Sequence, residues 1–166
     1  YFTEGRAALV SLAVSVALEL RSKNYPRVAV VLFGGGYLRD VAAAFHDRRT
    51  DSHVLQERGD STAGNPFPGI FIMTAENCGG LEFDAVILTG VDSGFVPPSL
   101  HNISPEGHLS VREEASRELY TAITRARYHL AFVCDRLNGP SEFIEPWISG
   151  GLLQEVRGTA SGSTMR

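Results

Sequence analysis

The chain has 166 residues, of which 43% are hydrophobic and 20% charged, a balance that favours one globular domain with a substantial core. Its formal net charge of -4 excludes the broad basic surface with which many proteins hold nucleic acid through charge alone. The two cysteines, Cys78 and Cys134, belong to no CxxC or Cys/His array, so the sequence predicts no metal site and a reduced, cytoplasmic setting.

The beginning of the chain predicts a helix that is followed by a strand, loop and helix unit. We expect Thr3 to cap a helix that runs to about Ser22 and is apolar on nearly every side. This helix is too short, and too often interrupted by serine, to span a membrane. Residues 27–33 form a β-branched run typical of a buried parallel strand, and three glycines then turn the chain into a helix over residues 37–47.

The middle of the chain alternates polar connections with buried strands. Residues 48–68 are rich in turn formers, and only residues 52–56 among them resemble a short strand. Apolar runs predict two further strands at residues 69–74 and 84–89. A loop over residues 90–109 follows them.

The last third of the chain completes an alternating pattern of strands and helices. Ser110 and Glu113 have the spacing of a capping box, which predicts a helix over residues 112–127. A strand at residues 129–134 and a short helix at residues 141–148 come next. The pattern predicts an α/β fold: four or five parallel strands in a sheet flanked by helices on both faces, in three layers. Ligands are then expected outside the carboxyl ends of the strands.

The two ends of the chain indicate a fragment of a longer protein. The chain begins with Tyr1 instead of methionine and enters a helix almost at once. Its last ten residues are small and polar and include no core-forming run. We therefore expect a single domain at residues 1–153 and a flexible tail at residues 154–166.

One stretch between two predicted strands has the residues of a ligand site. Thr74 ends one strand, Glu82 precedes the next, and Gly79 and Gly80 lie between them. A carboxylate here would face the ligand crevice and accept two hydrogen bonds from a ribose or another diol, while Thr74 would donate one to a phosphate oxygen. The alternative interpretation is a turn that needs a positive φ, with Glu82 in solvent.

Arg125 is the second candidate of this kind. On a helical wheel it lies about 120° from the apolar face, and the residue four positions earlier is Thr121 instead of an acid. An arginine without a surface partner can reach a phosphate supplied from outside the domain. The alternative interpretation is an ordinary arginine that lies along the surface.

Two segments together resemble a known family. LEFDAVILTG and REEASRELYTAITRARYHL resemble the last two signature motifs of the UvrD/Rep-type superfamily 1 helicases, in their second RecA-like motor domain. Weaker similarity extends over residues 4–148, which is most of the chain. The resemblance implies a RecA-like sheet of the P-loop NTPase type.

The resemblance also implies roles for individual residues. Arg125 matches the arginine that contacts the γ-phosphate of ATP, Glu82 the glutamate that binds the ribose, and Gly80 the glycine before it. Thr74 matches a residue near single-stranded DNA. In such helicases ATP and Mg²⁺ are bound mainly by the first RecA-like domain of the same parent chain. This chain has no GxxxxGK[ST] motif and a single lysine, so we expect it to be inactive alone.

The sequence departs from the family at several positions. Gly34 stands where the family has an arginine after the strand, and Arg39, one helical turn later, is the candidate substitute toward ATP. Glu76 and Gly79 replace a histidine and a lysine in the loop before Gly80, where Glu76 and Asn77 are the remaining candidates for contact with DNA.

The sequence thus predicts the second motor domain of an ATP-dependent, UvrD-like DNA helicase, with the first motor domain and single-stranded DNA as partners and no membrane. The departures leave open a helicase-like binding or regulatory module without ATPase activity. An unrelated α/β enzyme with a site centred on Glu82 is a third reading.

Overall fold

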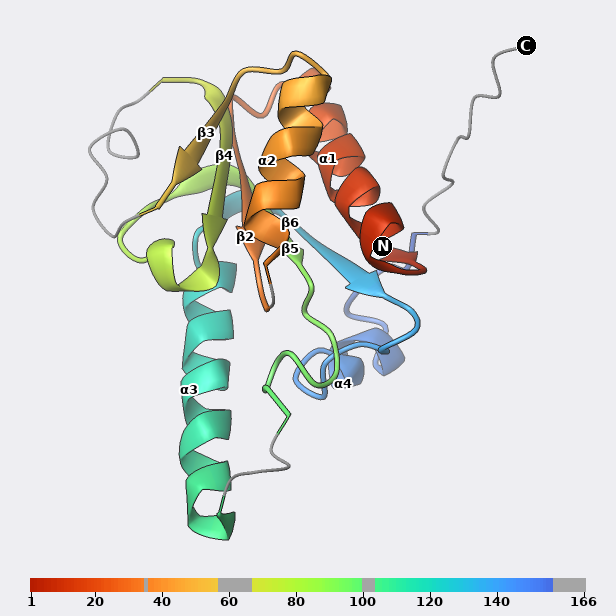
Figure 1. Ribbon diagram of the computed structural model, residues 1–166, viewed down its shortest axis with the longest axis vertical. Helices are drawn as coiled ribbons and strands as arrows, with labels where there is room; N and C mark the ends of the chain where they lie inside the picture. Colours follow the sequence, from red (N-terminus) through yellow and green to blue (C-terminus); the bar gives the residue numbers. More distant parts are fainter. Residues whose placement is uncertain (35, 57–66, 100–103, 157–166) are drawn as a thin grey trace.

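The computed structural model describes residues 1–34, 36–56, 67–99 and 104–156 and has three layers (Figure 1). A six-stranded sheet with the order β1-β6-β5-β2-β4-β3 forms the middle layer, and every neighbouring pair in it is parallel. Helices cover both faces of the sheet. The predicted fold class is confirmed, with six strands where four or five were expected.

The bounds of the elements define two edges of the sheet. The strands are β1 (Phe2–Thr3), β2 (Arg27–Leu32), β3 (Ser52–Leu55), β4 (Gly69–Thr74), β5 (Phe83–Thr89) and β6 (Ala126–Asp135). The helices are α1 (Arg6–Ser22), α2 (Tyr37–Asp47), α3 (Pro105–Ile123) and α4 (Glu145–Ser149), with the 3-10 turn η1 at Ala75–Asn77. Because the strands are parallel, they all begin at one edge, the amino edge, and all end at the opposite, carboxyl edge.

Alternation along the strands divides the core between the two faces of the sheet. Val30 and Ile87 pack with α1 and α2 on one face, while Val31 and Leu88 pack with α3 on the other. All four side chains are fully buried. Burying each side chain contributes about 1.5–3 kcal/mol. Because both faces of the sheet are buried, successive residues of a strand are all apolar and the strands appear in the sequence as continuous apolar runs. Figure 1 shows α1 and α2 side by side and α3 extending beyond the sheet.

The start of the chain differs from the prediction. Thr3 lies in β1, beside Asp135 of β6, so the expected cap by Thr3 is wrong. Helix α1 begins three residues later, and the amide of the preceding Gly5 donates to the Asp135 carboxylate at 3.0 Å. The helix also has an exposed stripe that includes Ser11 and Ser15, since only one side of it lies on the sheet and α2.

Helix α3 begins and ends earlier than predicted. It starts at Pro105, after Ser104, because proline suits the first position of a helix, so the capping box expected at Ser110 is wrong. The helix ends at Ile123 instead of residue 127, because the chain there is drawn into β6, which starts at Ala126. Arg125 therefore lies in the turn after α3, and the helical-wheel position assigned to it is wrong.

The end of the chain differs in detail. The short helix α4 begins at Glu145 and not at residue 141. The Ser141 hydroxyl donates to the Val96 carbonyl and accepts from the Phe143 amide, so residue 141 belongs to a turn before the helix. The predicted tail falls mainly on residues 157–166, which lie outside the described residues. The division at residue 153 stays a prediction.

A buried carboxyl group lies at the carboxyl edge, just after β5. Asp92 is fully buried, and its Oδ1 accepts a hydrogen bond from the Asp135 amide at 2.9 Å. Its Oδ2 has no hydrogen-bond partner among the described residues. Burial raises the pKa of Asp92 from 3.8 to about 6, because the ionised carboxylate loses its hydration, and the nearby Asp135 carboxylate acts in the same direction.

Asp92 is expected to make the folded state less stable as the pH rises. The folded state holds the Asp92 proton more tightly than the unfolded state does. The stability that the protonated carboxyl group contributes is therefore fully present below pH 3.8 and is lost as the pH rises through about 6. In urea unfolding measured between acidic and neutral pH, Asp92→Asn should remove about 3 kcal/mol of the pH dependence of the unfolding free energy. The exposed Asp51→Asn is the control, and identical pH profiles for wild type and Asp92→Asn would contradict the assignment.

Candidate functional site

The structure brings Glu82 and Arg125 together at the amino edge of the sheet. Glu82 directly precedes β5, and Arg125 directly precedes β6, the neighbouring strand. The Phe83 amide donates to the Arg125 carbonyl at 2.9 Å, which joins the two segments where their strands begin. Two candidates 43 positions apart in the sequence thus lie at one place in the fold.

The guanidinium of Arg125 is held by neutral groups. Its Nη1 donates to the Leu81 carbonyl at 3.1 Å, and its Nε donates to the Thr121 carbonyl at 3.0 Å. Its Nη2 donates to the Thr124 hydroxyl at 3.1 Å. Thr121 belongs to the last turn of α3, where unpaired carbonyls give a helix partial negative charge. No carboxylate pairs with Arg125 among the described residues, so its positive charge is not neutralised by an acid.

Glu82 has a partner that the sequence analysis did not single out. Arg127, the second residue of β6, donates to Oε2 of Glu82 from Nη2 at 2.6 Å and from Nε at 3.0 Å. Both side chains are about half exposed. The sequence does not indicate this pair, because the predicted helix over residues 112–127 includes Arg127. A strand that starts at Ala126 brings its arginine beside Glu82, because β5 and β6 are neighbours.

Gly80 is explained by its backbone. Its φ is +81°, and a Cβ at this position would meet nothing within 4 Å. Glycine is therefore needed for the left-handed conformation of the turn and not for space, which supports the turn interpretation. This turn carries the chain from the carboxyl end of β4 to the amino end of β5, so the expectation that Glu82 faces the carboxyl edge is wrong.

Of the DNA-binding candidates, Thr74 lies at the opposite edge. Thr74 ends β4 and is level with Thr89 at the end of β5, about 20 Å from the start of that strand. Glu76 and Asn77 follow in η1, and Asn77 donates from Nδ2 to the Gln56 carbonyl at 2.9 Å. The structure thus separates Thr74 from Glu82, whereas Glu76 and Asn77 line one groove with Thr121, the residue whose carbonyl accepts from Arg125.

A groove between η1 and α3 has an acidic lining. Its volume is about 690 Å³, and Glu76, Glu114 and Glu118 line it together with Arg117. Burial raises the pKa of Glu118, and the carboxylates of Glu76 and Glu114 raise it further. The charge of this groove disfavours a nucleic-acid phosphate beside Glu76.

Arg39 and Gly34 also lie at the carboxyl edge, after β2. Arg39 is exposed in the first turn of α2, so the structure does not bring it to Arg125. Gly34 has a φ of +72°, and a Cβ there would lie 2.5 Å from Cδ1 of Phe95. The Phe95 ring therefore fills the space that any side chain at position 34 would enter.

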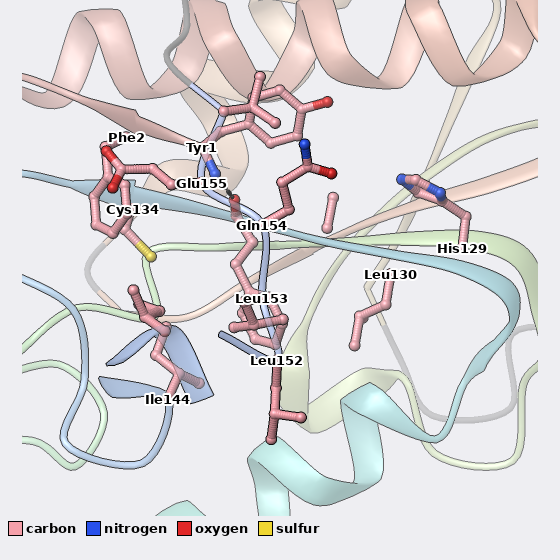
Figure 2. A pocket seen from close by; sticks show the side chains of 14 residues that line it. Tyr1, Phe2, His129, Leu130, Cys134, Ile144, Leu152, Leu153, Gln154 and Glu155 are labelled. Carbon is pink, nitrogen blue, oxygen red and sulfur yellow. Dashed lines mark hydrogen bonds between the residues drawn. The ribbon is translucent and has the colours of Figure 1, made fainter. Parts of the chain in front are cut away.

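The most apolar cavity described contains none of the predicted site residues. It has a volume of about 270 Å³ and lies between β6, α4 and the segment 152–156. Figure 2 shows Leu130 and Ile144 on opposite sides of Leu153 in the wall of this cavity. Among the described residues, no three His, Cys, Asp or Glu side chains gather as metal ligands would. None of the described helices has the length and apolar character of a membrane span.

The chain resembles known proteins over much of its length. Residues 50–136, slightly more than half of the chain, match the model of the UvrD-like helicase C-terminal domain. The chain is 36% identical over 77 residues to the ATP-dependent DNA helicase UvrD2 of Mycobacterium tuberculosis, across 46% of this chain and 11% of UvrD2. It is 39% identical over 137 residues to YjcD of Bacillus subtilis, a candidate ATP-dependent DNA helicase, across 75% of this chain and 17% of YjcD.

The chain thus spans only a small part of either curated relative. Among solved structures, the C-terminal domain of a possible DNA helicase from Lactobacillus strain WCFS1 has a TM-score of 0.61 at 21% identity. The match covers 87% of this chain and 76% of that domain. At this identity the likeness shows the fold alone.

Removing the Arg125 side chain is expected to weaken the folded state modestly. Arg125→Ala deletes three hydrogen bonds that tie the end of α3 to the loop before β5. Because the side chain is partly exposed and its partners are neutral, the loss should be about 1 kcal/mol in urea unfolding. Arg117→Ala, on the exposed face of α3, is the control and should change stability less. A loss no greater than that of the control would contradict the bridging role.

Proposed function

Because the chain belongs to the family of UvrD-like helicase C-terminal domains, we propose that it is the second motor domain of an ATP-dependent DNA helicase. In this proposal the first RecA-like domain of the same parent chain binds most of the ATP and the Mg²⁺. The present domain completes the site from the other side, with its amino edge facing the nucleotide.

The arrangement of charge at the amino edge carries the proposal. Arg125 is held in place by neutral acceptors and brings an uncompensated positive charge, which suits a phosphate group supplied by another domain. Glu82 brings a carboxylate to the same edge, which suits the hydroxyl groups of a ribose. Gly80 gives the turn that places Glu82 there.

The chemistry follows from these positions. ATP supplies the γ-phosphate on which negative charge is redistributed during hydrolysis. An arginine that reaches this phosphate from a second domain stabilises that charge, typically by about 10³ to 10⁵ in rate. Closure of the two domains on ATP would let Arg125 exchange its carbonyl partners for phosphate oxygens, and hydrolysis would release it.

For the DNA path we propose the opposite, carboxyl edge. Thr74 has a hydroxyl and Asn77 has an amide, and both groups can contact a phosphate or a sugar. Glu76 adds negative charge to the adjacent groove, so we expect it to border the path without contacting phosphate. Arg39 lies at this edge as well, which does not support its predicted contact with ATP.

One observation favours the alternative of a binding or regulatory module. The ring of Phe95 occupies the place of any side chain at position 34, where the family has an arginine. The family gives that arginine a contact with ATP, whereas position 34 lies here at the carboxyl edge, so neither the residue nor its place in the fold supplies that contact. ATP hydrolysis distinguishes an active motor from a binding or regulatory module.

ATP hydrolysis by the full-length protein that contains this chain tests the proposal. Arg125→Ala should lower DNA-stimulated kcat by about 10³-fold while nucleotide binding is largely retained, because Arg125 acts on charge in the transition state. Arg112→Ala, which removes an exposed ion pair between α3 and Glu142, is the control and should leave kcat unchanged. An inactive wild type would favour the regulatory module, and an active Arg125→Ala variant would remove Arg125 from the site.

The isolated chain is expected to show no ATP hydrolysis above background and only weak DNA binding. It has no phosphate-binding loop motif, and its net charge is -4. Magnesium-dependent phosphate release and fluorescence anisotropy with single-stranded DNA at about 0.2 M salt measure the two properties. Robust hydrolysis by the isolated chain, or tight binding at that salt concentration, would contradict the assigned roles.

A further inference from the structure

We propose that Arg127 is a positioning residue that holds Glu82 ready to receive a ribose, an inference that rests on the proposed function of the amino edge. Arg127 lies on β6 and Glu82 precedes β5, so the pair connects the starts of two adjacent strands. In this role Arg127 fixes the orientation of the Glu82 carboxylate before the nucleotide binds.

The geometry of the pair leaves part of the carboxylate for a ligand. Both hydrogen bonds from Arg127 end on Oε2 of Glu82, at 2.6 and 3.0 Å. Oε1 receives neither of them. A ribose hydroxyl can therefore donate to Oε1 while Arg127 stays bound to Oε2.

The pair also removes a cost of binding. Glu82 is about half exposed, so without a partner its side chain would move among several rotamers. A nucleotide that binds a mobile glutamate must order it, and a glutamate already held by Arg127 needs less ordering. Because strand β6 fixes the backbone of Arg127, the carboxylate is held relative to the sheet.

The two neighbouring arginines differ in their partners, and this difference separates their roles. Arg127 is neutralised by the Glu82 carboxylate, whereas Arg125 is bonded only to carbonyl and hydroxyl oxygens. A phosphate gains more from the uncompensated charge of Arg125. We therefore assign the phosphate to Arg125 and the orientation of Glu82 to Arg127.

Equilibrium binding to the full-length protein tests the proposal. Titration calorimetry would compare ADP with 2′,3′-dideoxy-ADP, which lacks the ribose hydroxyls, for wild type, Arg127→Ala, Glu82→Gln and the double variant. Arg127→Ala should weaken ADP binding about threefold to tenfold, the effect of leaving one side chain to be ordered by the ligand. It should leave binding of the dideoxy nucleotide unchanged. The double variant should bind ADP no more weakly than Glu82→Gln alone, since Arg127 acts through Glu82.

Strand β6 offers a matched control at its other end. Arg136 directly follows the strand and forms a similar half-exposed ion pair with Glu155 at 2.9 Å. Arg136→Ala should leave ADP binding unchanged. Arg127→Lys keeps the charge but loses the two-pronged geometry, so it should give an intermediate affinity. Thermal unfolding of every variant shows that each one is folded.

The outcomes distinguish this inference from the function on which it rests. Tighter ADP binding by Arg127→Ala would show that the pair blocks the ribose and would overturn the positioning role. An equal loss for ADP and dideoxy-ADP, or a loss of kcat near that of Arg125→Ala, would place Arg127 at the phosphates and overturn it too. A wild type that binds ADP and an Arg127→Ala variant that matches it would overturn this inference alone. A wild type that binds no ADP would overturn the proposed function as well.

Discussion

The hydrogen bond from the Phe83 amide to the Arg125 carbonyl, at 2.9 Å, is the constraint on which the candidate site depends. It sets the register in which β5 and β6 begin side by side. That register puts Glu82 next to Arg127 and the Arg125 guanidinium against the Leu81 carbonyl. The polar pairs alone are weak at an exposed edge, and the buried sheet behind them supplies the rigidity.

The parallel sheet also keeps Thr74 apart from Glu82. Thr74 and Glu82 are close in sequence, yet the chain between them crosses from the carboxyl edge to the amino edge. A nucleotide at one edge and a nucleic acid at the other would then act on the same rigid body. In the proposed function, closure at the amino edge would move the carboxyl edge with it and so couple hydrolysis to movement along DNA.

Much of this fold is predictable from the sequence, because burial on both faces makes β2, β4 and β5 continuous apolar runs. The boundaries of α3 are not predictable in this way. Ser110 and Glu113 have the spacing of a helix start although they lie inside the helix, and the helix ends at Ile123 only because the following strand, β6, pairs with β5. The same error hid Arg127, whose direction depends on where β6 begins. The motifs identified Glu82 and Arg125 as candidates but not the edge on which they meet, which tertiary register alone decides.

The packing of Phe95 on Gly34 has a consequence for the descent of this chain. Position 34 combines a φ of +72° with a Cβ site 2.5 Å from an aromatic ring, so two obstacles oppose any larger residue there. A lineage in which this glycine had replaced an arginine would not regain the arginine in one step. The Phe95 side chain would have to be replaced by a smaller one, and the backbone at position 34 would have to change its φ, at the same time. Residues 34 and 95 should therefore vary together among related chains, and the exchange acts as a ratchet.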